Sequence, residues 1–125
     1  MKIIIAGSRS IEDGSVTRRA LEDALKEWNV APRIGITIIH GGCNSGPDYH
    51  AFALDVSMGA HVIIVPAQWS TFGRRSGPIR NKIMAEMGDA LVAVWDGESK
   101  GTENMIQEAT KRGLKVYIHK HKSTK

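Results

Sequence analysis

Five short runs of apolar residues recur along the chain, and within each run the apolar positions are nearly continuous rather than alternating with polar ones. β-Branched residues dominate these runs, which favours extended backbone. The pattern is typical of strands that are buried on both faces, as in a parallel sheet covered by helices. The predicted strands lie at residues 3–6, 36–39, 62–65, 91–95 and 116–118.

Four segments between these runs carry apolar residues at helical spacing. We expect helices over residues 16–28, 47–59, 78–87 and 102–112. Pro78 suits the first position of the third helix, Thr102 is a good N-cap for the fourth, and Gly113 supplies the stop of the fourth. The alternation of strand and helix predicts a single-domain α/β fold, a doubly wound, parallel, five-stranded sheet with helices on both faces.

The chain has 125 residues, of which 42% are hydrophobic, and this is enough for one domain with its own core. The expected domain covers residues 1–119, followed by a basic C-terminal tail at residues 120–125. A lone cysteine, Cys43, excludes an internal disulfide framework and a zinc ribbon. No apolar run approaches the roughly 18 residues of a membrane span, and no signal-peptide core is present, so we expect no membrane association and, by default, a cytoplasmic location.

The formal net charge of +4 is unevenly distributed. Residues 1–114 hold 13 basic and 13 acidic side chains, so the whole excess lies in residues 115–125. It comes from Lys115, Lys120, Lys122 and Lys125. Because residues 1–114 carry no net charge, they offer no broad positive surface to a polyanion. This favours a solvated tail over a nucleic-acid-binding one.

Glycine and small polar residues gather in the segments that follow the predicted strands, whereas the segments that follow the helices are plain. The carboxyl ends of parallel strands meet at one edge of the sheet, and ligands of such folds bind at that edge. Four polar loops on one edge therefore predict a ligand site. They cover residues 7–10, 41–48, 67–77 and 96–102.

The groups in these loops indicate a phosphorylated ligand. Glycines expose backbone N–H groups, helix N-termini favour anions, and Ser8 and Arg9 add a hydroxyl and a guanidinium. One nine-residue window then holds four cations and no acid, namely Arg74, Arg75, Arg80 and Lys82. Because arginine suits bidentate contact with phosphate, a nucleotide or a ribosyl phosphate is the natural ligand of such an edge.

Other kinds of site are not predicted. The chain has no G-x-x-x-x-G-K-[ST] motif, and no G-x-G-x-x-G opens the first helix, which counts against a P-loop NTPase and an ordinary NAD dehydrogenase. The five histidines lack close ligand spacing, so we expect neither a metal nor a cofactor. Two residues keep two interpretations each: Trp69 stacks on a base or folds its loop onto the sheet, and Asp48 caps the second helix or binds a ribose hydroxyl.

Five short motifs in order resemble a known family. They are Gly7-Ser8-Arg9, Gly41-Gly42 with Gly46-Pro47-Asp48, Pro66-Ala67-x-Trp69, Gly77-Pro78-x-Arg80-Asn81-x-x-Met84, and Ser99-x-Gly101-Thr102. Together they resemble the YspA/YpsA-related branch of the SLOG superfamily, over about residues 2–118. That superfamily includes the LOG phosphoribohydrolases and Smf/DprA. The resemblance implies a Rossmann-like fold, binding of nucleotides or nucleotide-derived ligands, and a homodimer, since LOG-like relatives commonly form dimers.

The LOG enzymes also suggest a reaction, cleavage of the N-glycosidic bond of a nucleoside monophosphate. Their R-K-x-x-M arginine matches Arg80, with Met84 at the same offset, whereas Asn81 replaces the lysine. Their glutamate, three residues after the Gly-Thr threonine, corresponds to Met105. A thioether cannot take a proton or stabilise an oxocarbenium ion as a carboxylate does, so the resemblance makes Arg80 a catalytic candidate without its carboxylate partner.

We therefore expect a protein that binds a nucleotide or nucleotide-derived small molecule at the carboxyl edge of the sheet. The alternatives are a LOG-like N-glycosidase and a nucleic-acid-binding accessory module, the latter resting on the basic tail and on the kinship with Smf/DprA. The expected ligand- and phosphate-binding residues are Gly7, Ser8, Arg9, Gly41, Gly42, Asp48, Trp69, Arg80, Asn81, Ser99, Gly101 and Thr102.

Overall fold

The computed structural model describes residues 1–8, 11, 14–30, 36–41, 61–66 and 73–121, with the side chain of Arg74 excepted. The helix that we predict over residues 47–59 lies outside the described residues. Within them, five strands, three α-helices and one 3₁₀ turn follow one another along the chain.

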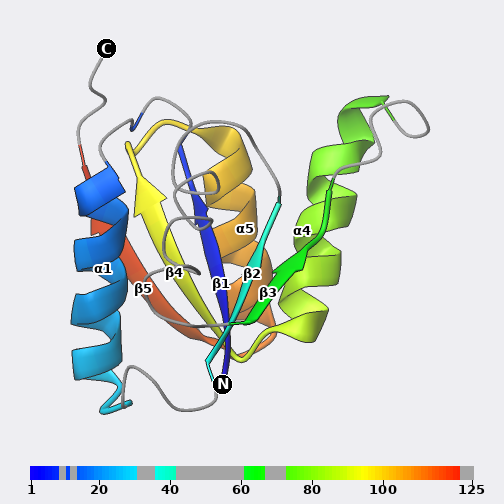
Figure 1. Ribbon diagram of the computed structural model, residues 1–125. Helices are drawn as coiled ribbons and strands as arrows, with labels where there is room; N and C mark the ends of the chain where they lie inside the picture. Colours follow the sequence, from blue (N-terminus) through cyan, green and yellow to red (C-terminus); the bar gives the residue numbers. More distant parts are fainter. Residues whose placement is uncertain (9–10, 12–13, 31–35, 42–60, 67–72, 122–125) are drawn as a thin grey trace.

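The five strands form one sheet in which every neighbouring pair is parallel. The order across the sheet is β3 (His61–Ile64), β2 (Thr37–His40), β1 (Lys2–Gly7), β4 (Ala90–Trp95) and β5 (Lys115–Lys120), as Figure 1 shows. All five predicted strands are present, and the parallel, Rossmann-like α/β fold is confirmed. Strand β5 extends through Lys120, the first residue of the segment that we set apart as a tail.

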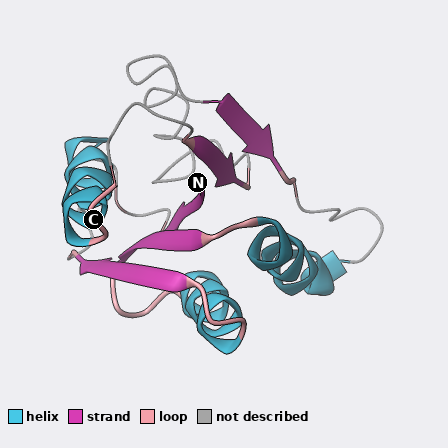
Figure 2. Ribbon diagram, turned by 90° about the horizontal axis from the view of Figure 1, so that it is seen from below, coloured by secondary structure: helices cyan, strands magenta, loops and turns pink. Residues whose placement is uncertain are grey.

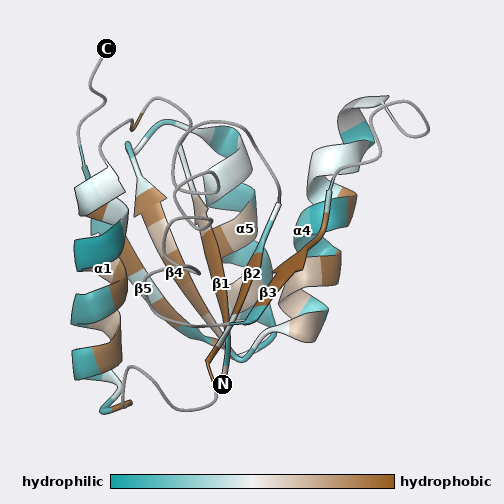
Figure 3. Cartoon of the chain, viewed as in Figure 1, coloured by the Kyte–Doolittle hydropathy of each residue, from teal (hydrophilic) through white to brown (hydrophobic). Residues whose placement is uncertain are grey.

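Helices cover both faces of the sheet (Figure 2). Helix α1 (Gly14–Glu27) lies on one face, and α4 (Ser76–Met87) and α5 (Lys100–Lys111) lie on the other. The hydrophobic sides of these helices turn toward the sheet, whose strands are themselves apolar (Figure 3). Among the described helices, none combines the length and the apolarity that crossing a membrane requires.

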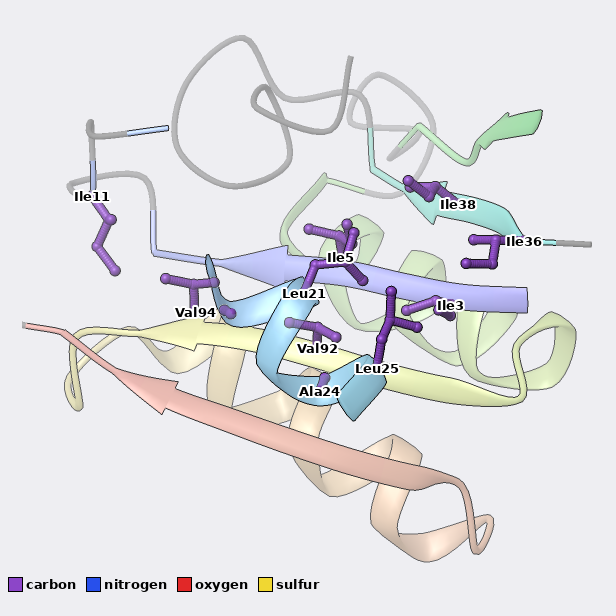
Figure 4. Packing of buried hydrophobic residues seen from close by; sticks show 11 residues of the cluster. Ile3, Ile5, Ile11, Leu21, Ala24, Leu25, Ile36, Ile38, Val92 and Val94 are labelled. Atoms are coloured by element: carbon purple, nitrogen blue, oxygen red, sulfur yellow. The ribbon is translucent and has the colours of Figure 1, made fainter. Parts of the chain in front are cut away.

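Alternate residues of the central strands supply two separate cores, because successive side chains of a strand point to opposite faces. Under α1, Leu21, Ala24 and Leu25 pack against β1 and β4, as Figure 4 shows. The opposite core joins Met84 of α4 and Met105 of α5 to the same two strands. This burial on both faces explains why the sequences of β1 and β4 are continuously apolar, whereas the edge strands β3 and β5 are less buried than we predict.

The starts of α4 and α5 differ from those that we predict. Helix α4 begins at Ser76, two residues before Pro78, because the 3₁₀ turn η1 (Gly73–Arg75) leads directly into it with Arg75 in helical conformation. Helix α5 begins at Lys100, and its N-cap is Ser99 rather than Thr102. The predicted stop at Gly113 is confirmed: this glycine has φ +75°, the left-handed conformation that ends a helix at little cost.

Candidate functional site

The carboxyl ends of all five parallel strands lie at one edge of the sheet, and the N-termini of α4 and α5 lie at the same edge (Figure 1). Four of the predicted site residues, Arg9, Gly42, Asp48 and Trp69, lie outside the described residues. The other eight belong to the described part of this edge: Gly7, Ser8, Gly41, Arg80, Asn81, Ser99, Gly101 and Thr102.

Arg80 connects α4 to the end of β2. Its Nη1 donates a hydrogen bond to the carbonyl oxygen of Gly41 over 3.3 Å, and its Nε donates to Oδ1 of Asn81 over 3.0 Å. Two of the five guanidinium N–H groups therefore have partners among the described residues. The other N–H groups of a half-buried guanidinium held in this way suit an anionic ligand, because the planar fork is already oriented.

Asn81, the next residue of α4, connects this helix to α5. Its side-chain amide donates to the carbonyl oxygen of Gly101 over 3.2 Å and to Oδ1 of Asn104 over 2.9 Å. Asn81 is only 4% exposed, so its side chain positions its neighbours rather than facing the solvent. We did not predict Asn104, because a polar residue in the middle of a helix carries no sequence signal for a contact with another helix.

Ser8 lies between β1 and β4, where the strand order of the sheet reverses. Open parallel sheets bind their ligands at such a position. The backbone N–H of Asp96 donates to Oγ of Ser8 over 3.0 Å, and the N–H of Ser8 donates to the carbonyl oxygen of Val94 over 3.0 Å. Ser8 is 1% exposed. Through these two hydrogen bonds it links the end of β1 to the end of β4.

Asp96 shapes the loop that leads into α5. Its Oδ1 accepts the backbone N–H groups of Glu98 and Ser99, each over 2.8 Å, and Gly97 between them has φ +86°. A left-handed residue at this position explains why the turn contains a glycine. The aspartate is a positioning residue that the sequence pattern did not single out, although Asp before Gly is a known turn signal.

Ser99 and Thr102 hold the first turn of α5. Oγ of Ser99 accepts the backbone N–H of Thr102 over 3.4 Å and the hydroxyl of Thr102 over 3.3 Å. Its carbonyl oxygen accepts Nε1 of Trp95 over 3.0 Å, and Nζ of Lys120 lies 5.5 Å from the centre of the same indole. Gly101 is exposed, and a Cβ added there would meet nothing within 4 Å, so the space beside this residue is open.

Met105, at the position of the LOG glutamate, lies in the core. It is 1% exposed and belongs to the cluster that includes Met84 and Ala109. The residue therefore contributes to packing between α5 and the sheet. In the part of the chain that the structure describes, no group of three or more His, Cys, Asp or Glu residues could hold a metal ion.

Comparisons of the chain with protein-family models, with curated proteins and with solved structures found no match in any of the three.

Proposed function

We propose that the protein binds a nucleotide or a nucleotide-derived phosphorylated small molecule at the carboxyl edge of its sheet. The observation that carries the proposal is the guanidinium of Arg80, which Gly41 and Asn81 hold at the end of β2 with further N–H groups to offer. A guanidinium oriented before the ligand arrives loses little side-chain entropy on binding, and phosphate oxygens match its planar fork.

The surroundings of Arg80 support a ligand of limited size. The α4 and α5 helices direct their N-terminal, partially positive ends to this edge, and α4 has no acidic residue in its first turn. Three glycines lie at the same edge: Gly7 ends β1, Gly41 follows β2 and Gly101 belongs to the first turn of α5. This arrangement favours one or two phosphate groups with an attached sugar over a long polyanion.

The buried position of Met105 supports binding rather than N-glycosidase activity as the first interpretation. A hydrolase of the LOG type needs a carboxylate at the reacting bond, and the corresponding side chain here packs among apolar residues. Glu98, in the loop before α5, is exposed and is a carboxylate that could take its place. The reaction therefore stays an alternative that the binding experiment must include.

Calorimetric titration with a panel of nucleoside mono- and diphosphates, cyclic dinucleotides and ADP-ribose tests the proposal. We expect saturable binding of at least one compound, and Arg80→Ala should weaken it about tenfold to a hundredfold, the usual effect of losing a charge-assisted hydrogen bond. Lys111→Ala is the matched control, because it removes one exposed positive charge from the last turn of α5, away from this edge, and should leave the affinity within about twofold.

Two results would overturn the proposal. One is the absence of saturable binding to every phosphorylated compound, and the other is an Arg80→Ala protein that binds as tightly as the unchanged protein. Thermal melting of both variants checks that they are folded. Chromatography of the incubated mixtures for free base separates a binding protein from an N-glycosidase, which would consume the nucleoside monophosphates.

A further inference from the structure

Ser76, the first residue of α4, holds a buried hydroxyl that the described contacts do not explain. The residue is 1% exposed, and its Oγ has no hydrogen-bond partner within the described part of the chain. A hydroxyl that is removed from water without a partner destabilises the folded state. Native proteins retain such groups where they serve a purpose other than stability, and a ligand oxygen would supply the missing partner.

The place of Ser76 on the helix connects it with Arg80. The two residues are four apart, so they lie on the same face of α4, one turn from each other. Side chains of a helix lean toward its N-terminus, so the side chain of Arg80 extends toward the turn that contains Ser76. Arg80 in turn donates to Gly41 at the end of β2. Hydroxyl and guanidinium thus belong to residues on one face of the first turns of α4, and we refer to this face as the α4 corner.

The electrostatics of this corner favour an anion. The first turn of α4 has no acidic residue, and no side chain caps it. Arg75, directly before the helix, adds a further cation, and the N-terminal end of a 12-residue helix carries a partial positive charge. The start of α5 differs, because there the side chains of Ser99 and Thr102 are already bonded to the turn.

We propose that Ser76 and Arg80 together hold the phosphate group of the ligand at the start of α4. This inference rests on the proposed function and names the part of the ligand that the corner recognises. The Ser76 hydroxyl donates to one phosphate oxygen, and the guanidinium of Arg80 donates to others. The corner therefore recognises the phosphate and not the base, which makes a nucleoside monophosphate a much better ligand than the nucleoside.

The test compares the full chain with Ser76→Ala in calorimetric titrations with the four common nucleoside monophosphates and the four matching nucleosides, with inorganic phosphate as a competitor. We expect Ser76→Ala to bind the best monophosphate at least fivefold more weakly and to bind its nucleoside unchanged. Ser76→Cys, which is slightly larger than serine and only a weak donor, should lose as much affinity. Thr110→Ala is the control, because it removes an exposed hydroxyl at the opposite end of α5 and should leave the affinity as it is.

Thermal melting without ligand provides a second readout. Because the alanine variant no longer buries an unpaired hydroxyl, it should melt about 2–5 °C higher than the unchanged protein. If the unchanged protein binds a monophosphate and Ser76→Ala binds it equally well, this inference is wrong while the proposed function stands. If the unchanged protein binds no monophosphate, this inference fails, and the proposed function fails with it only if the diphosphates, cyclic dinucleotides and ADP-ribose do not bind either. A lower melting temperature for Ser76→Ala would mean that the hydroxyl serves the fold, which also contradicts the inference.

Discussion

Asn81 shows how one buried side chain holds the other parts of the candidate site in register. Oδ1 of its side chain accepts a hydrogen bond from Nε of Arg80, and its side-chain amide donates to Gly101 and Asn104 of α5. One residue thereby orients the guanidinium and fixes the distance between two helices. Because all these contacts are buried or half-buried, each leaves an unsatisfied polar group if its partner is removed.

Replacing Asn81 with alanine should lower the free energy of unfolding by about 1–3 kcal/mol, the cost of leaving buried partners unpaired. Urea unfolding at neutral pH measures the loss. Asn104→Ala removes one of the three contacts and should cost less, and the double variant should cost less than the sum of the two, since they share a hydrogen bond. An Asn81→Ala protein as stable as the unchanged chain would show that this network does not hold the helices together.

The residues of the site could be predicted from the sequence better than their roles could. Glycines and hydroxyl residues after a strand indicate the carboxyl edge, because the edge follows from parallel pairing alone. Which hydroxyl meets a ligand depends on side-chain rotamers and on the nearest N–H group. The Ser8 hydroxyl accepts the N–H of Asp96, whereas Ser76, in no predicted motif role, has a buried hydroxyl without a partner among the described residues.

At the scale of elements, the start of α5 depends on a choice between two possible caps. Ser99 and Thr102 are both residues that cap helices, and their spacing of three lets either serve. Asp96 decides between them, because its carboxylate accepts the N–H of Ser99 and places that residue in extended conformation at φ −60°, ψ 119°. Periodicity predicts where a helix lies but not its first residue, since the preceding turn sets that residue.

Ser99→Ala should cost about 0.5–2 kcal/mol of unfolding free energy through the lost cap, measured by chemical denaturation. Ser99→Asp is the matched variant, because a carboxylate caps equally well and its charge favours the positive end of the helix. We expect the aspartate variant to unfold within about 0.5 kcal/mol of the unchanged protein. Equal stabilities of all three proteins would contradict the capping role of this side chain.

At the scale of the whole molecule, the sheet separates the two cores, and its outer strands are less buried than its central strands. The parallel sheet was predictable, because continuous apolar runs that alternate with helices are typical of strands in a covered parallel sheet. The strand order was not, since short connections do not reveal which edge of β1 each later strand joins.

In β5, an edge strand, Tyr117 packs beside the core under α1, close enough to the helix for the carboxylates of Asp23 and Glu27 to act on its phenol.

This contact between edge strand and helix makes the stability of the whole molecule sensitive to alkaline pH. Partial burial raises the pKa of Tyr117 above its ordinary value of 10.0, and the charges of Asp23 and Glu27 raise it further. The unfolded chain therefore loses the phenolic proton first, so the contribution of Tyr117 to stability is complete below about pH 10 and is lost as the pH rises through the higher, folded-state pKa. Urea unfolding at pH 8 and pH 11 should show a larger loss for the unchanged protein than for Tyr117→Phe, in which the effects of the lysines are the same and cancel in the comparison. Equal losses in the two proteins would mean that the phenol does not couple β5 to α1.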